Sequence, residues 1–129
     1  MIAAVADTHT TVWYPRLSAN ARQVIERAFQ NGDEIGISSI SLIEMIYLTE
    51  KARIPPIAVQ TLLESLLNSA YPFQELPVDN SVARHMTSIS RDEVPDMPDR
   101  IIAATGLRYN VAVISRDGKI RASRIQTIW

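Results

Sequence analysis

Four acidic residues stand at positions where a parallel α/β sheet would bring their carboxylates together. Asp7 and Asp117 each follow an apolar run, whereas Glu44 and Asp99 each fall near the start of an expected helix, and Asp96 is a fifth candidate. A cluster of ionised carboxylates repels itself unless a cation lies among them. Carboxylate and water oxygens suit Mg²⁺ or Mn²⁺. The pattern therefore predicts a metal-dependent enzyme that acts on a phosphate-bearing substrate.

Each of these acids also has a purely structural interpretation. Asp7 can cap a helix or form an Asx turn, and Asp117 precedes a glycine in a common turn pair. Asp96 and Asp99 match an N-cap and its partner at the third helical position. Glu44 can be a solvated helix residue, although apolar residues flank it on both sides. Taken together, a shared site explains the set better than coincidence does.

The composition fits one folded domain. The chain has 129 residues, of which 47% are hydrophobic, so we expect a single domain over residues 1–129 with a substantial core and no intrinsic disorder. A formal net charge of -1 argues mildly against a simple polyanion-binding module. It says less about a nuclease, whose metal-binding acids mask nearby basic residues. The absence of cysteine excludes disulfides and cysteine-based sites.

The apolar patterns also bear on location. The run at the N-terminus stops at Asp7 and lacks the length and the basic start of a signal peptide. No segment approaches the roughly 20 apolar residues of a membrane span. We therefore expect a soluble, cytoplasmic protein with no membrane association.

Apolar runs and helical spacing predict alternating strands and helices. Strands are expected at residues 2–6, 34–38, 73–78, 111–114 and 125–129. Helices are expected from Ser18 to Asn31, from Ser39 or Ser41 to about Ala52, from Pro55-Pro56 through Leu67, from a cap at Asp79 to about Ile89, and from Pro98 to Tyr109, with a loop at residues 90–98. This order predicts right-handed βαβ units and a three-layer α/β/α sandwich around a central, mainly parallel sheet.

Such a sheet explains why the acids should meet. The carboxyl ends of parallel strands and the amino ends of the following helices share one edge, and ligands bind there near the point where the strand order reverses. Asp7, Glu44, Asp99 and Asp117 all fall on this edge. Helix dipoles would also keep Glu44 and Asp99 ionised, as a cation site needs.

Four segments together resemble the PIN domain and, more narrowly, the VapC-type toxins of bacterial toxin–antitoxin pairs. They are VADTHTTVWY (5–14), SSISLIEMIYL (38–48), DMPDRIIAATGL (96–107) and VAVISRDGKI (111–120). The resemblance covers nearly the whole chain in the family's order and spacing. Its most specific part is the run from Asp99 to Thr105, preceded by Asp96, and the next is Ser115-Arg116-Asp117.

The resemblance implies a role for each matching residue. The catalytic and metal-binding acids would be Asp7, Glu44, Asp99 and Asp117, with Asp96 as an auxiliary acid at the mouth of the site. Thr8 and Ser115 would be hydroxyls that hold the acids or a water on the metal. The family more often has threonine at the position of Ser115, and serine keeps the hydroxyl.

The resemblance also implies an activity and partners. It implies a Mg²⁺-dependent or Mn²⁺-dependent endoribonuclease that cleaves RNA by in-line attack and leaves 5′-phosphate and 3′-hydroxyl ends. It further implies a cognate VapB-type antitoxin and a homodimer. In the family, helices near the Leu62–Leu67 stripe form the dimer face and receive the antitoxin. An apolar surplus there would make sense if a partner helix covered it.

RNA must be held by cations near the acidic edge. Six basic residues lie close to the acids in sequence, namely Arg91, Arg100, Arg116, Lys119, Arg121 and Arg124. Arg116 and Lys119 flank Asp117 and are the preferred phosphate contacts. Arg100 can instead pair with an acid. Trp13 and Tyr14 can stack on a base or pack under the first long helix.

Three other functions deserve comparison. A phosphatase that forms an aspartyl-phosphate usually has a second aspartate two residues after the first, and His9 stands at that position. A phospho-receiver signalling module needs an acid pair after the first strand, which Ala6-Asp7 does not supply. A PIN-like RNA-processing nuclease outside toxin systems fits the same acids, and only the short chain favours the toxin.

Overall fold

A parallel sheet forms the centre of the protein. The computed structural model describes residues 1–12 and 17–129, and the strands there run in the order β3-β2-β1-β4-β5 with every neighbouring pair parallel. The strands are β1 (Ile2–Ala6), β2 (Glu34–Ser38), β3 (Phe73–Leu76), β4 (Ala112–Ile114) and β5 (Thr127–Ile128).

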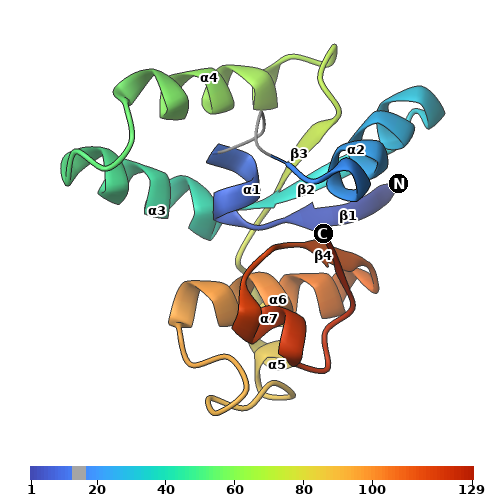
Figure 1. Cartoon of the computed structure of the whole chain (residues 1–129), viewed down its shortest axis with the longest axis vertical. Coiled ribbons are helices and arrows are strands. Elements are labelled where there is room, and N and C mark those ends of the chain that lie inside the picture. The colour runs from blue at the N-terminus through green and yellow to red at the C-terminus, as the bar shows by residue number, and fades with distance from the viewer. Residues whose placement is uncertain (13–16) are drawn as a thin grey trace.

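Two groups of helices cover the two faces of this sheet (Figure 1). On one face lie α1 (Thr8–Val12), α2 (Ala19–Asn31), α3 (Ser39–Glu50) and α4 (Pro56–Leu67). On the other lie α5 (Asn80–Met86), α6 (Met97–Tyr109) and α7 (Gly118–Ala122). The predicted three-layer α/β/α sandwich is therefore confirmed, and the sheet is wholly parallel among the described strands.

Alternation along the strands builds a separate core on each face. Ala4 and Ala6 point into the core under α2, α3 and α4, whereas Val5 points into the core under α5 and α6. The same alternation separates Ile114 from Val113 on β4. Both faces are thus fully covered, as is usual for parallel strands.

The order of the strands reverses beside β1. The chain passes from β1 to β2 and β3 on one side and then returns to place β4 on the other side of β1. Open α/β sheets bind ligands at the carboxyl ends of the two strands flanking such a reversal. Asp7 follows β1 directly, and Ser115 follows β4 directly.

Local chemistry explains where the helices begin and end. The Ser18 hydroxyl accepts the Ala21 N–H at 3.1 Å, and Gly32 ends α2 with a φ of 73°, a conformation that glycine adopts readily. The N-cap of α3 is Ser38, one residue before the expected start, which places Ser41 in the first turn. Strand β3 stops at Leu76 because Pro77 lacks a donor to continue the ladder.

Two short helices differ from the predicted pattern. Thr8–Val12 forms α1 although it offers little apolar periodicity, and Gly118–Ala122 forms α7 where a turn is expected. In both cases an aspartate side chain accepts N–H groups of the first turn, so a five-residue helix forms by capping. Trp13 and Tyr14 lie outside the described residues. None of the described helices is long and apolar enough to cross a membrane.

Candidate metal centre

Asp7 occupies the switch point of the sheet. Its side chain is 2% exposed, and its Oδ1 accepts the Thr10 N–H at 2.7 Å. Its own N–H donates to the Ile114 carbonyl at 3.1 Å, and the Thr10 hydroxyl donates to the same carbonyl at 2.9 Å. These bonds fix the carboxylate between the ends of β1 and β4. Asp7 is thus both a helix cap and a buried acid, so its capping role does not exclude a role in a metal site.

Glu44 reaches the same edge from α3. The Thr8 hydroxyl donates to Glu44 Oε1 at 2.6 Å, and Thr8 Oγ1 also lies 2.9 Å from Ser41 Oγ. Burial raises the pKa of Glu44, and the bond from Thr8 opposes that shift. The negative charges of Asp96 and Asp7 raise this pKa further, while His9 lowers it.

Asp96 and Asp99 lie in the first turn of α6. Asp96 is the exposed N-cap and accepts the Asp99 N–H at 3.3 Å, as the capping pattern predicts. Asp99 is half-buried, and burial is the main reason why its pKa rises to about 7. The charges of Asp96, Asp117, Glu44 and Asp7 each raise that pKa further. The other four predicted acids therefore all lie close enough to Asp99 to raise its pKa.

Asp117 closes the site from the β4 side. It is the N-cap of α7, and its Oδ1 accepts the N–H groups of Lys119 at 2.9 Å and Ile120 at 3.0 Å. Its own N–H donates to the hydroxyl of Ser115, which is fully buried, at 3.0 Å. Ser115 thus holds the backbone that carries Asp117.

The chemistry of these donors fits a divalent cation. Among residues 1–12 and 17–129, no group of three or more acidic or histidine side chains is arranged to hold a metal ion as it stands. Mg²⁺, however, keeps several waters and is bound by only one or two carboxylates, so a looser ring of acids suits it. A cation would also relieve the mutual repulsion that raises the pKa of Asp99.

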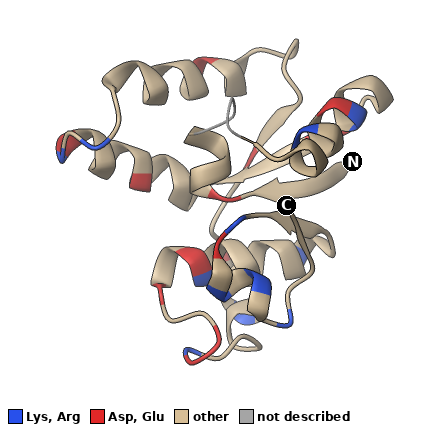
Figure 2. Cartoon of the chain, viewed as in Figure 1, with Lys and Arg blue, Asp and Glu red and all other residues tan. Residues whose placement is uncertain are grey.

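Four of the six basic candidates form two contrasting pairs, and the other two, Arg91 and Arg121, are exposed. Arg116 and Lys119 are exposed on either side of Asp117. Figure 2 shows basic positions on and just before α7, close to acidic positions at the start of α6. This arrangement allows an anion to approach the acidic edge between cations.

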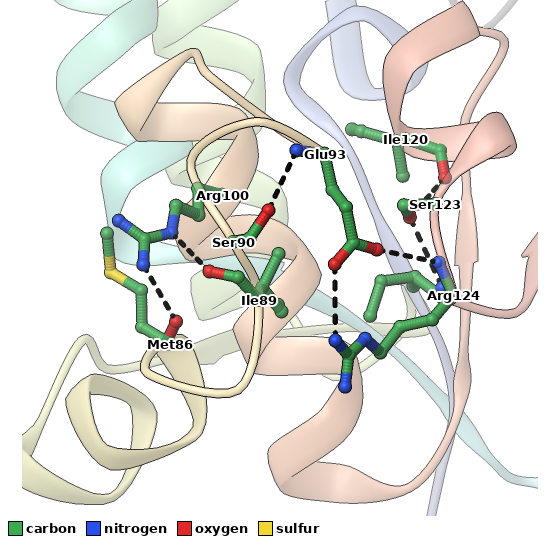
Figure 3. Close-up of polar contacts among 9 residues, drawn as sticks. Met86, Ile89, Ser90, Glu93, Arg100, Ile120, Ser123 and Arg124 are labelled. Carbon is green, nitrogen blue, oxygen red and sulfur yellow. Dashed lines mark hydrogen bonds and ion pairs between the residues drawn. The ribbon is translucent and has the colours of Figure 1, made fainter.

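Arg100 and Arg124 are engaged with the protein itself (Figure 3). Arg100 donates from Nε to the Ile89 carbonyl at 2.8 Å and from Nη2 to the Met86 carbonyl at 3.1 Å. Arg124 pairs with Glu93 at 3.2 Å, and its hydrogen bonds hold the pKa of Glu93 below its ordinary value. Arg100 thus binds carbonyls at and just beyond the end of α5 rather than an acid, which leaves Arg116 and Lys119 as the stronger candidates for phosphate contact.

Sequence reasoning did not single out Ser41 as part of the site. It considered Ser41 only as a possible helix cap, but the side chain is fully buried beside Thr8. The available signal was its spacing, because a serine three residues before Glu44 shares a helix face with it.

Two grooves elsewhere on the protein are mainly apolar and are not lined by these acids. A groove of about 840 Å³ lies between α2, α4 and the start of β3, and Ile25, Phe29, Ile57 and Tyr71 contribute to its walls. A second groove of about 410 Å³ lies between α3 and α4 and is lined by Ile46, Leu63 and Leu67 among others. Neither is lined by the five acids.

Comparison with known proteins agrees with this geometry. The family model described as PIN domain matches residues 4–125. The chain is 29% identical over 137 residues to the protein named Ribonuclease VapC22 of Mycobacterium tuberculosis (strain ATCC 25618 / H37Rv), covering all of both chains.

Solved structures share the fold. VapBC2 from Rickettsia felis bound to a promoter DNA fragment aligns with a TM-score of 0.72 and 17% identity, over 98% of this chain and 97% of that one. DNA-bound VapBC from Salmonella typhimurium aligns with a TM-score of 0.69 and 22% identity, with the same coverage. A toxin–antitoxin complex from Klebsiella pneumoniae aligns with a TM-score of 0.67 and 21% identity, over 98% of this chain and 97% of that one.

Proposed function

The chain belongs to the PIN-domain family, and on this basis we propose that it is a metal-dependent endoribonuclease, the toxin of a VapBC-type toxin–antitoxin pair. The observation that carries the proposal is the electrostatic coupling of Asp99 to Asp96, Asp117, Glu44 and Asp7 at the switch point of the sheet. The name of the mycobacterial relative and the titles of the structural neighbours support the same assignment.

We assign Asp7, Glu44, Asp99 and Asp117 to hold Mg²⁺ or Mn²⁺, some of them through water. When bound, the ion would supply Lewis-acid chemistry that activates a water and neutralises charge on the scissile phosphate. The contribution of the chain is to fix the carboxylates: Thr10 holds Asp7, Thr8 holds Glu44, and Ser115 holds the backbone of Asp117. Asp96 stays exposed at the mouth as the auxiliary acid.

The proposed reaction is hydrolysis of an RNA phosphodiester by in-line attack. Water adds to phosphorus, the bond to the 3′ oxygen breaks, and the products carry a 5′-phosphate and a 3′-hydroxyl. A cluster of carboxylates favours this route, because attack by the ribose 2′-hydroxyl would not need a metal site. We also propose that the protein acts in the cytoplasm.

Exposed apolar side chains support the proposed protein partners. Ile43 and Tyr47 on α3 and Leu63 and Leu67 on α4 are all exposed, with Leu67 at 91%. Helices that are apolar on their outer face usually pack against another chain. We assign the α3–α4 surface, defined by these four residues and Ile46, to a homodimer contact. The 840 Å³ groove between α2 and α4 is assigned to a VapB-type antitoxin.

The test is RNA cleavage by purified, antitoxin-free protein. Total cellular RNA is incubated with Mg²⁺, Mn²⁺ or EDTA, and the new ends are mapped. We expect metal-dependent cuts with 5′-phosphates that disappear in Asp7→Asn and Asp99→Asn. Asp92→Asn is the matched control, because Asp92 is an exposed acid in the loop before α6 and should leave cleavage unchanged.

Two results would contradict the proposal. The first is the absence of cleavage with either metal while circular dichroism shows a folded protein, which would favour a binding or signalling role. The second is cleavage that survives EDTA and both variants, which would indicate a contaminant or a mechanism that does not use these acids.

A further inference from the structure

A buried pair of hydroxyls links α3 to the first residue of α1. Thr8 is 6% exposed and Ser41 is fully buried, and their hydroxyl oxygens lie 2.9 Å apart. Thr8 Oγ1 is also 2.6 Å from Glu44 Oε1. Because Ser41 and Glu44 are three residues apart, both face Thr8 from the same side of α3.

The number of protons fixes the direction of these bonds. A threonine hydroxyl has one proton to donate and two lone pairs that accept. The Glu44 carboxylate can only accept, and its bond with Thr8 is the shorter of the two, so the Thr8 proton is given to Glu44. The 2.9 Å contact then requires Ser41 to donate its proton to Thr8 Oγ1.

We infer that Ser41 is a positioning residue of the candidate metal centre: its hydroxyl donates to Thr8 and keeps the Thr8 proton directed at Glu44. Chains of hydrogen bonds strengthen one another in a low-dielectric interior. The relay from Ser41 through Thr8 thereby holds the Glu44 carboxylate in one orientation. Partners of metal-binding carboxylates matter for affinity because they fix the orientation of the ligand. This inference rests on the proposed function of Glu44 as part of a cation site.

The test compares two variants of nearly equal shape. Both variants add a methyl group to Cβ. Ser41→Thr keeps the hydroxyl, whereas Ser41→Val has a second methyl group of similar size in its place. Any overpacking in this buried position affects both, so their difference reports the hydroxyl alone. Thr49→Val is the control, because the Thr49 hydroxyl donates only to the Met45 carbonyl within α3.

The first measurement is the affinity of metal-free protein for Mn²⁺, determined by isothermal titration calorimetry in the absence of RNA. We expect Ser41→Val to bind Mn²⁺ roughly tenfold more weakly than Ser41→Thr, as for other partners of metal ligands. Thr49→Val should bind as wild type does. Equal affinities for Ser41→Val and Ser41→Thr, with both folded by circular dichroism, would overturn the inference.

The second measurement separates this inference from the proposed function. The Mg²⁺ concentration for half-maximal RNA cleavage should rise by a similar factor in Ser41→Val, while the KM for RNA stays near the wild-type value. If wild type does not cleave RNA but the Mn²⁺ difference persists, the positioning role stands and the nuclease assignment fails. If wild type cleaves and the two variants are indistinguishable, the nuclease assignment stands and the role of Ser41 fails.

Discussion

The backbone N–H of Asp99 donates to the carboxylate of Asp96 at 3.3 Å, so an exposed acid caps the helical turn that carries a half-buried one. The same Asp96 charge is, after burial, the largest cause of the raised pKa of Asp99. Asp96 therefore has two separable effects: its oxygen stabilises the start of α6, and its charge favours the protonated form of Asp99.

Substitutions at Asp96 should separate these two effects. Asp96→Asn keeps an acceptor for the Asp99 N–H but removes the charge, so stability should stay near wild type and the pKa of Asp99 should fall. Asp96→Ala removes both, and loss of an N-cap costs about 1 kcal/mol in the free energy of unfolding. Urea unfolding gives the stabilities, and carboxyl NMR titration gives the pKa. Equal stability of the two variants would show that the cap contributes little.

Asp99 should make the metal-free protein less stable at higher pH. Its pKa is about 7 in the folded protein, whereas an unperturbed aspartate, as in the unfolded chain, has a pKa of 3.8. Between these two values the folded state keeps a proton that the unfolded state has lost. The free energy of unfolding should therefore fall as pH rises from about 4 to about 7 and level off above. Because Asp99 is only half-buried, solvent screening reduces the effect to roughly 1–2 kcal/mol.

Asp99→Asn should remove that part of the pH dependence. At pH 8 in EDTA we expect the variant to melt a few degrees higher than wild type, although it should lack cleavage activity. At pH 4 the difference should be small, since Asp99 is protonated in the folded state and only about half ionised in the unfolded state. Asp92→Asn serves as control and should follow wild type at both pH values. A wild-type advantage at pH 8 would contradict the raised pKa.

The sequence predicts the order of strands and helices and the edge on which the acids meet. Apolar runs and caps are local signals, and the parallel arrangement follows from alternation, so Asp7 and Asp117 could be placed at strand ends without coordinates. The capping role of Asp96 is equally local, because an aspartate three residues before another acid at a helix start is a pattern visible in the chain.

The features of the fold and the site that the sequence does not predict depend mostly on contacts between distant parts of the chain. The Ser41–Thr8 contact joins residues 33 positions apart, and no local pattern predicts it. Arg100 is similar, since its two carbonyl partners lie 11 and 14 residues away and are reached only after α5 packs against α6. The short helices α1 and α7 are harder to predict because they have little apolar periodicity, although a helix cap at Asp7 is one of the interpretations that the sequence allows.

Arg100 should matter for stability more than for RNA contact. Arg100→Met removes two hydrogen bonds from a charged donor to the Ile89 and Met86 carbonyls, so we expect a loss of roughly 2 kcal/mol. Arg100→Lys keeps the charge but lacks the forked guanidinium that reaches both carbonyls. Its free energy of unfolding should therefore lie between those of wild type and Arg100→Met. Arg84→Gln removes an exposed arginine on α5 and should be neutral. Urea unfolding of the three variants checks the order.

Arg116 and Lys119 should contribute to RNA affinity through phosphate contacts. In an Asp99→Asn background, which prevents cleavage, Arg116→Gln and Lys119→Gln should each weaken binding of a labelled single-stranded RNA. Each should also reduce the slope of log affinity against log salt by about 0.7, the value for one released counterion on single strands. Fluorescence anisotropy over a salt series measures both. Arg27→Gln on α2 is the control, and an equal effect there would indicate non-specific charge loss.

The apolar α3–α4 surface should mediate self-association. Leu67 is 91% exposed and Ile46 lines the groove between the two helices, so burial against a second copy would remove apolar area from water. Leu67→Glu combined with Ile46→Glu places charge in that contact and should convert a dimer to a monomer in size-exclusion chromatography with light scattering. Because both side chains face outward, the circular dichroism spectrum should not change. Gln23→Glu adds a charge to the exposed side of α2 and should leave the dimer intact. A wild-type protein that is already monomeric would contradict the homodimer. A double variant that stays dimeric would place the dimer contact on another surface.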